Sequence, residues 1–151
     1  MIQDGAVVIR DGKIHRAGSR LEVFDEGLET IDAEGKVVCP GFIDLQVNGG
    51  GGVFVTEDTD YESVCTMAKT HSSFGTTSLL PTVITAPEKQ IRAALSAISD
   101  AARRGTGTAS VLGAHLEGPF INRKRRGTHD ERYILPPSID RFSAFHSASQ
   151  G

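Results

Sequence analysis

The sequence places an imidazole and a carboxylate at the end of an apolar segment. His115 and Glu117 close the run that begins at Ser110, and because they are two residues apart they lie on one side of an extended strand. The chain turns after Glu117 at a Gly-Pro pair, and a carboxylate in that position suits a metal ligand or a general base. Alternatively, Glu117 accepts backbone N–H groups of its loop, and His115 is a hydrogen-bonded interior histidine. No HExxH motif or other closely spaced ligand set completes a zinc site.

A second set of polar side chains ends the segment 42–48. Asp44, Gln46 and Asn48 alternate with apolar residues, so we expect them on one side of a strand. Thr82 closes another apolar segment, which begins at residue 76. Polar groups at the ends of buried strands are costly unless each finds a partner. A functional site at these strand ends explains them most simply.

Four consecutive glycines, residues 49–52, follow Asn48. They could form a backbone nest for an anion, or they could let the chain turn sharply beneath a ligand. The run matches neither the P-loop nor the GxGxxG pattern, so nucleotide binding by either motif is disfavoured. We therefore favour the turn.

The basic residues 123–126 form the densest run of positive charge. A solvated loop is the simplest interpretation of such a run. It also lies between Glu117 and His129, where a phosphorylated substrate could meet it. Thr128 and His129 offer a hydroxyl and an imidazole for substrate contact, although His129 fits an exposed loop residue equally well.

The elements that must position these groups alternate between strand and helix. The segments 42–48, 76–84 and 110–116 are predicted strands, and amphipathic helices separate them. This order predicts an α/β fold with a parallel sheet. The strands of such a sheet all end at one edge, where α/β folds carry their chemistry.

Capping boxes predict where the two helices begin. Thr59 and Glu62 form one such pattern, and Thr85 and Glu88 form the other. A buried stripe on the second helix is expected to include Ala102. A polar loop then runs from 117 to about 133, and a last helix is expected to begin near Ser138.

The first forty residues have a pattern of strands and turns only. Asp11-Gly12 between apolar runs predicts a β-hairpin. A second pair of short strands is expected at 30–31 and 36–38, around Glu34-Gly35. The pattern changes at Pro40-Gly41, so we expect two domains, residues 1–40 and residues 41–151.

Composition excludes several classes of partner. The 151 residues contain 16 Lys and Arg against 19 Asp and Glu, so nothing indicates nucleic-acid binding. No stretch reaches the roughly 18 uninterrupted apolar residues of a membrane-spanning helix, and no secretory signal follows Met1. Cys39 and Cys65 form no disulfide framework, which suits a reducing cytosol. We therefore expect a cytoplasmic protein with no nucleic-acid or membrane partner.

Three separated motifs resemble the amidohydrolase superfamily, in the form found in N-acetylglucosamine-6-phosphate deacetylases. The motifs are Pro40–Asp44 followed by Gln46 and Asn48, Leu80-Pro81-Thr82, and residues 115–120 followed by Asn122 and 127–129. The resemblance implies a partial (β/α)8 TIM-type barrel, made of its first three β/α units. Part of a small β-sandwich precedes that barrel. It further implies that the chain is the N-terminal portion of such an enzyme, truncated at both ends.

The same resemblance implies an activity and a set of roles. The activity is hydrolysis of the acetamide of N-acetylglucosamine 6-phosphate to glucosamine 6-phosphate and acetate, with one divalent metal ion, for which zinc is expected and other divalent metals are possible. Glu117 matches the carboxylate ligand of that metal. Gln46 and Asn48 occupy the His-x-His positions of most amidohydrolases and are not expected to be ligands. The remaining matches are substrate-contacting positions, namely Asn122, Thr128 and His129, with His129 polarising the scissile carbonyl.

The resemblance also indicates what this chain lacks. The acid/base aspartate of the family's eighth strand and the metal-binding histidines of strands five and six are not in it, so we expect the isolated chain to be inactive. We expect the complete enzyme to be a homodimer that binds an amino-sugar phosphate. Two alternatives remain: an amidohydrolase acting on a different amide or amino sugar, and a non-catalytic fragment or interaction module that pairs with another chain.

Overall fold

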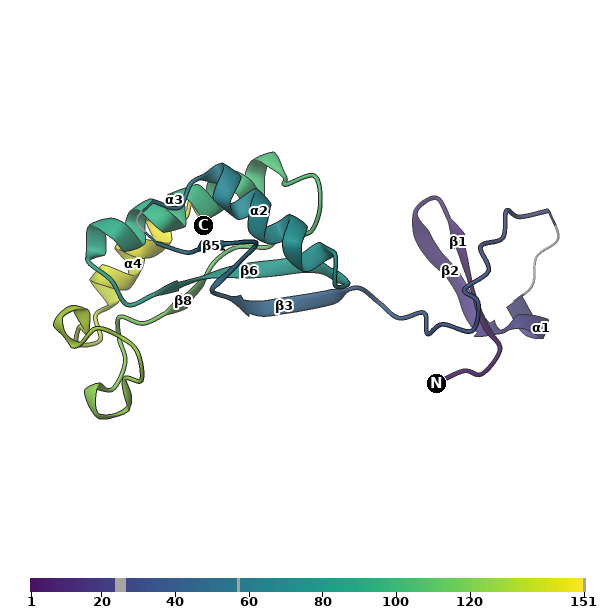
Figure 1. Cartoon of the computed structure of the whole chain (residues 1–151), viewed down its shortest axis with the longest axis horizontal. Helices are drawn as coiled ribbons and strands as arrows, with labels where there is room; N and C mark the ends of the chain where they lie inside the picture. Colours follow the sequence, from purple (N-terminus) through teal and green to yellow (C-terminus); the bar gives the residue numbers. More distant parts are fainter. Residues whose placement is uncertain (24–26, 57, 151) are drawn as a thin grey trace. The chain divides into compact units, whose positions relative to one another are not determined.

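The computed structural model describes residues 1–23, 27–56 and 58–150. It divides into two compact units, Met1–Cys39 and Pro40–Gly151 (Figure 1). In the first unit, β1 (Gly5–Arg10) and β2 (Lys13–Ser19) pair as an antiparallel hairpin. Asp11 and Gly12 form its turn with φ values of 51° and 70°, which confirms the hairpin prediction.

The second hairpin of this unit, expected around Glu34-Gly35, does not form. The turn itself is present, because the backbone N–H of Lys36 donates to the carbonyl of Ala33 (2.9 Å). Residues 30–31 and 36–38 are not in strands, and Ile31 is 90% exposed, so no apolar face stabilises a pairing. A short helix that the sequence did not indicate, α1 (Arg20–Val23), follows β2 instead.

The second unit is built on a parallel sheet, which confirms the α/β class. In this sheet β6 lies between β3 on one side and β7 and β8 on the other. The helices α2, α3 and α4 lie on one side of the sheet in Figure 1. In chain order the elements are β3 (Phe42–Val47), β4 (Gly49–Gly50), β5 (Val53–Phe54), α2 (Tyr61–Ser72), β6 (Thr76–Ile84), α3 (Glu88–Arg104), β7 (Ser110–Val111), β8 (His115–Glu117), the 3-10 helices η1 (Arg123–Arg125) and η2 (Glu131–Tyr133), and α4 (Ile139–Ala148).

Apolar side chains fill the layer between the helices and the sheet. The larger cluster joins α2, α3 and α4 to β6 and β7, and a smaller one joins Val47, Ala68 and Leu79 to Ala109. The larger cluster contains Val55, Val64, Met67, Val83, Ile91, Ala94, Leu95, Ile98, Ala101, Val111 and Phe145. At the end of the buried stripe on α3, Ala101 is buried in place of the predicted Ala102, which is exposed.

Both predicted helices form, but neither predicted capping box does. Asp60, one residue later than expected, caps α2: its carboxylate accepts from the backbone N–H of Ser63 (2.8 Å) and from the Ser63 hydroxyl (2.7 Å). The hydroxyl bond and then the backbone bond lower the pKa of Asp60. Thr59 instead accepts from the backbone N–H of Thr56. The residue before α3 is Pro87, whose hydrocarbon side chain cannot accept a hydrogen bond from the helix N-terminus.

The last helix begins where the sequence indicates. The hydroxyl of Ser138 caps α4 by accepting from the backbone N–H of Arg141 (3.3 Å). Phe145 of this helix is buried, and its ring centroid lies 6.2 Å from that of Phe120. Of the helices in the described ranges, none has the length and apolar character that crossing a membrane requires.

A β-bulge divides the predicted strand 110–116 into β7 and β8. Val111 pairs with Leu79, and His115 pairs with Thr82. An advance of three residues along β6 therefore matches an advance of four residues from β7 to β8. The added residue lies between β7 and β8, where Gly113 has a φ of 151° that other residues rarely adopt.

The bulge changes which side chains face the helices. Side chains of a strand alternate between the two faces of the sheet. One added residue therefore moves every later side chain of the strand to the opposite face. Val111 belongs to the core beneath the helices, and after the bulge Leu116 packs against that same core. His115 and Glu117 therefore lie on the opposite face of the sheet.

We expect Leu79→Ala to destabilise this unit strongly. Leu79 is fully buried in the middle strand, and truncating a buried leucine costs about 2–5 kcal/mol. The matched control is Leu45→Ala on the neighbouring strand, where the side chain is 65% exposed and we expect a change within about 0.5 kcal/mol. Urea unfolding followed by circular dichroism measures both, and equal losses would contradict this packing.

Candidate active site

Side chains from three distant segments meet on the face of the sheet away from the helices. The Gln46 amide, near the end of β3, donates to Oε2 of Glu117 (3.1 Å). The other carboxylate oxygen, Oε1, lies 3.7 Å from Nε2 of His129, which belongs to the loop after β8. Gln46 thus holds one oxygen of Glu117, while Oε1 and Nε2 face each other beyond hydrogen-bond distance.

The second ring nitrogen of His129 has a closer partner. Nδ1 lies 2.8 Å from Oγ1 of Thr85, which follows the end of β6. Thr85 is 4% exposed and the His129 side chain 11%, whereas the Glu117 side chain is 34% exposed. We call Gln46, Glu117, His129 and Thr85 the polar row. The end of the polar row at Glu117 is accessible to solvent, and the end at Thr85 is buried.

A second histidine on this face contacts a buried threonine of the neighbouring strand. His115 Nδ1 lies 3.2 Å from the hydroxyl of Thr82, and these two residues are register partners in β8 and β6. Thr82 is fully buried. The geometry supports the hydrogen-bonded interior interpretation of His115.

The basic run is part of the framework of the His129 loop. Arg126 donates to the carbonyl of His129 (2.9 Å), and Arg123 donates to the carbonyls of Glu131 and Ile134 (both 3.0 Å). Two of the four cations therefore hold the backbone at His129 and in the residues that follow it. This explains why a charged segment adopts a defined loop.

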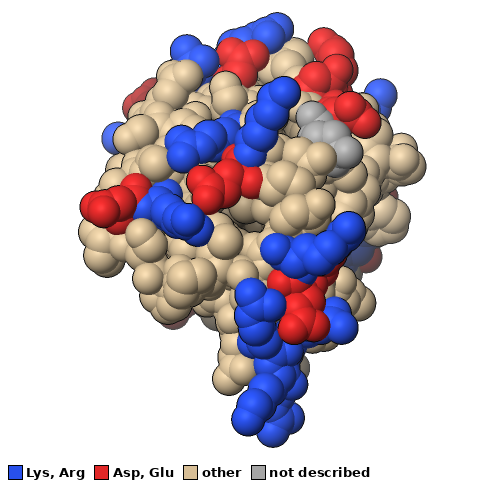
Figure 2. Space-filling view, turned by 90° about the vertical axis from the view of Figure 1, so that its left-hand side faces the viewer, with Lys and Arg blue, Asp and Glu red and all other residues tan. Residues whose placement is uncertain are grey.

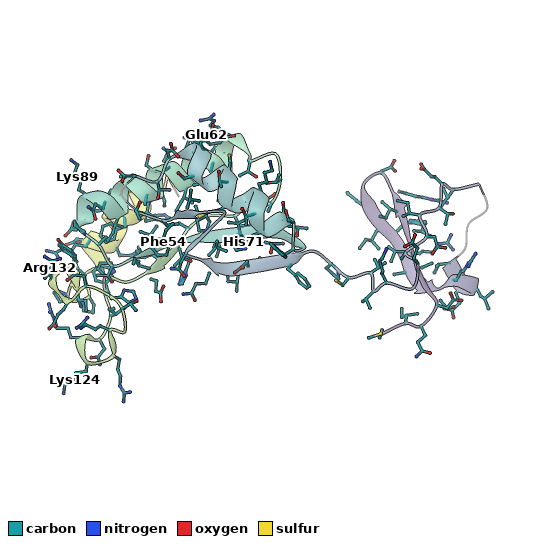
Figure 3. The ribbon with its side chains drawn as sticks, viewed as in Figure 1. Phe54, Glu62, His71, Lys89, Lys124 and Arg132 are labelled. Atoms are coloured by element: carbon teal, nitrogen blue, oxygen red, sulfur yellow. The ribbon has the colours of Figure 1, made fainter. Side chains whose placement is uncertain are left out.

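The other two cations of the run are exposed. In the described part of the chain, neither the Lys124 nor the Arg125 side chain makes a hydrogen bond or an ion pair. Figure 2 shows Lys and Arg side chains gathered on a projection at the lower edge of this view, and Figure 3 places Lys124 at the end of the loop. The solvated-loop interpretation describes these two residues.

Two predicted substrate-contacting residues lie on the same loop. The Asn122 side chain is occupied as the cap of η1, where its oxygen accepts from the backbone N–H of Lys124 (2.9 Å). Thr128 is exposed and immediately precedes His129. Of the predicted site residues, the structure therefore brings Gln46, Glu117 and His129 together.

The remaining polar residues of the segment 42–48 do not join the polar row. Asp44 and Val47 pair with Leu79 and Pro81, so three steps on β3 match two on β6, and this irregularity interrupts the alternation expected for Asp44 and Gln46. The Asp44 carboxylate accepts from the backbone N–H of Gln46 (3.1 Å). Asn48 is half-buried, and its carbonyl accepts from Val55 (2.9 Å).

The glycine run after Asn48 forms a turn, as predicted. β4 and β5 pair across Gly51 and Gly52 as a small antiparallel hairpin. The His71 side chain, labelled in Figure 3, anchors this hairpin, since its Nε2 donates to the carbonyl of Gly49 (2.9 Å).

Thr85 is the member of the polar row that the sequence analysis missed, because it was assigned to a helix cap. One signal could have identified it. Thr85, like Thr82, stands where a buried strand ends, which is the place from which α/β folds build sites.

The described residues do not form a complete metal site. No group of three or more His, Cys, Asp or Glu side chains in these ranges could hold a metal ion. Glu117 alone fits the role of a ligand, because Oε1 has no hydrogen-bond donor in the described structure and the side chain reaches solvent. It could be one member of a ligand set whose other members are not among these residues.

The chain is similar to known proteins along most of its length. The Amidohydrolase family matches residues 37–144. The chain is 37% identical over 134 residues to an N-acetylglucosamine-6-phosphate deacetylase of Haemophilus influenzae, covering 89% of this chain and 34% of that protein. It is 35% identical over 149 residues to an N-acetylgalactosamine-6-phosphate deacetylase of a Shewanella species, covering 89% and 37%.

A solved structure gives the same result. The crystal structure of an N-acetylglucosamine-6-phosphate deacetylase from Pasteurella multocida superposes with a TM-score of 0.82 at 33% identity. That match covers 98% of this chain and 38% of the other. The chain thus spans about a third of the length of the curated relatives it matches.

Next to His129, Asp130 should titrate far below an ordinary aspartate. Hydrogen bonds from the Arg132 guanidinium (Nη2 to Oδ2, 2.6 Å) and then from the Arg132 backbone N–H lower the pKa of Asp130 from 3.8 to about 2. The resulting stabilisation is present above the unfolded-state pKa and is lost as the pH falls through about 2.

Carbon-13 NMR of the Asp130 carboxyl measures this. In Arg132→Gln we expect the Asp130 pKa to rise toward 3.8, because the first and largest cause of the shift is removed. Arg103→Gln is the matched control, since Arg103 pairs with Asp100 instead. A midpoint near 4 in the folded unsubstituted chain would contradict the ion pair.

Proposed function

Because this chain belongs to the amidohydrolase family, we propose that it is part of a deacetylase that hydrolyses the acetamide of N-acetylglucosamine 6-phosphate to glucosamine 6-phosphate and acetate. The single observation that carries this proposal is the meeting of Gln46, Glu117 and His129 on one face of the sheet. Relatives named for this activity share 36–43% identity with the chain over 108 residues or more.

We propose that the parallel sheet is the first three β/α units of a (β/α)8 barrel. In that architecture the helices surround the sheet and the inner face points to the barrel axis, which would put the polar row inside. A whole barrel takes about 250 residues, so three units would account for this chain. Residues 1–40 would belong to a small β-sandwich, with 41–151 in the barrel.

Glu117 is proposed as one ligand of a divalent metal ion, with zinc as the expected metal. Such an ion, when bound, activates a water molecule and polarises a carbonyl. Gln46 orients Glu117 by donating to Oε2, which leaves Oε1 for the metal. In this proposal Gln46 and Asn48 are not ligands.

His129 is proposed to stabilise the oxygen of the scissile carbonyl. Its Nε2 faces the open side of the polar row, 3.7 Å from Glu117 Oε1. A donor at this position would act on the charge that develops on the oxygen during hydrolysis. Thr128 and Asn122 are proposed to contact the sugar, and both are exposed on the loop that carries His129.

A second candidate substrate is N-acetylgalactosamine 6-phosphate. The Shewanella relative with that name is 35% identical to this chain over 149 residues, close to the 37% of the Haemophilus influenzae relative. The two sugars differ in one hydroxyl configuration, and the polar row acts on the acetamide that they share. The row is therefore compatible with both.

We also propose a cytoplasmic location and a homodimer for the whole protein. Both described cysteines, Cys39 and Cys65, are free thiols, which suits a reducing compartment. The homodimer rests on the family resemblance alone.

The proposal can be tested with a chimera of this chain and the remaining two-thirds of the Haemophilus influenzae relative. We expect the zinc-loaded chimera to release acetate from N-acetylglucosamine 6-phosphate, and more slowly from the sugar without phosphate. The 151-residue chain with zinc is expected to release none. A folded, metal-loaded chimera that is inactive on both hexosamine phosphates would contradict the proposal.

In that chimera, Glu117→Gln should abolish most of the activity and reduce metal content. Removing a partner that merely orients a ligand costs about 10–100-fold, so removing a ligand should cost more than about 100-fold. Glu62→Gln is the matched control, because Glu62 is exposed on α2, away from the polar row (Figure 3). Unchanged metal content and acetate release in Glu117→Gln would exclude the ligand role.

A further inference from the structure

The Thr85 hydroxyl is a buried donor with one partner. Thr85 is 4% exposed, and in the described structure Nδ1 of His129, at 2.8 Å, is the hydrogen-bond partner of its Oγ1. A hydroxyl carries one proton to donate, and a buried donor without an acceptor is costly. The Thr85 proton therefore belongs on the bond to His129.

This bond determines where the neutral imidazole carries its own proton. A neutral histidine has one protonated nitrogen and one acceptor nitrogen. If Thr85 donates to Nδ1, the ring proton must be on Nε2. We infer that Thr85 is a positioning residue that holds His129 in the Nε2–H tautomer, with that N–H directed into the open side of the polar row.

The surrounding backbone makes the contact rigid. Ile84 and Glu117 are register partners in β6 and β8, so the residues that follow them, Thr85 and Gly118, are neighbours. Any side chain at Gly118 would overlap Oγ1 of Thr85, and Gly118 has a φ of 96°. Only a residue without a Cβ lets the loop pass this close to the hydroxyl.

Residues at the ends of β6 and β8 therefore lie next to both ring nitrogens of His129. Thr85 meets Nδ1, while Glu117 faces Nε2 at 3.7 Å, a gap that leaves the N–H free to donate elsewhere. A carboxylate or carbonyl in place of Thr85 would accept from Nδ1–H and leave neutral Nε2 without a proton. With the threonine, His129 is a hydrogen-bond donor at Nε2 without carrying a positive charge.

The catalytic meaning of this tautomer rests on the proposed function, but the tautomer itself can be measured without substrate. Long-range proton–nitrogen correlation NMR of the 151-residue chain, in mildly alkaline buffer, distinguishes protonated from unprotonated ring nitrogens. His129→Gln identifies the resonances. We expect a protonated Nε2 and an Nδ1 shifted upfield by its hydrogen bond.

Two substitutions test the role of Thr85. In Thr85→Val we expect the His129 Nδ1 resonance to move downfield, and in Thr85→Ser, which keeps the hydroxyl, to stay near its original position. Thr82→Val is the matched control, since it should shift the Nδ1 resonance of His115 and leave that of His129.

Two results would overturn the inference. One is a protonated Nδ1 and an unprotonated Nε2 for His129 in the unsubstituted chain, a measurement that does not depend on any variant. The other is an unmoved His129 resonance in a folded Thr85→Val chain.

The chimera gives a separate kinetic measurement. There we expect Thr85→Val to lower kcat roughly 10–100-fold with little change in KM, the loss typical when a hydrogen-bond partner that orients a metal-site residue is removed, and Thr85→Ser to restore most of it. An inactive chimera with the expected His129 resonances would contradict the proposed function and leave the tautomer assignment standing. Full activity in Thr85→Val would remove the positioning role.

Discussion

The residue added between β7 and β8 decides which side chains of the third strand form the candidate site. Without it, the alternation that places Val111 beneath the helices would place His115 and Glu117 there as well, in an apolar core where a carboxylate has no partner. With it, Leu116 fills the core position and Glu117 emerges on the opposite face, within reach of Gln46. Gly113 makes this possible by adopting a backbone conformation that other residues avoid.

The two faces of the sheet in the second unit differ in character: one packs against the helices and the other carries the polar row. On one face, apolar side chains from three helices pack against β6 and β7, and this burial supplies most of the stability. On the other face, polar groups pair with one another across strands and loop. Because the core does not depend on the polar row, that face is free to carry groups selected for chemistry.

His129 is held more tightly than its place in a charged loop suggests. Arg126 holds its carbonyl, Thr85 holds one ring nitrogen, and Glu117 faces the other. An imidazole fixed in this way needs little reorganisation when charge develops nearby, which is the condition for effective electrostatic stabilisation. Under the proposed function, a metal ion and the substrate would bind at the solvent-exposed end of the polar row, beside Glu117.

The sequence by itself determined most of the local elements and the family. Periodicity and turn residues predicted the first hairpin, the strand 76–84, the helices α2 and α3, and the start of α4 near Ser138, since those signals act within a few residues. Only the tertiary structure decided the bulge at Gly113, the contact of Thr85 with His129, and the hydrogen bonds from Arg123 and Arg126 to backbone carbonyls. Each of these depends on which residues stand opposite one another across strands and loops, and that register is set by packing between segments far apart in the chain.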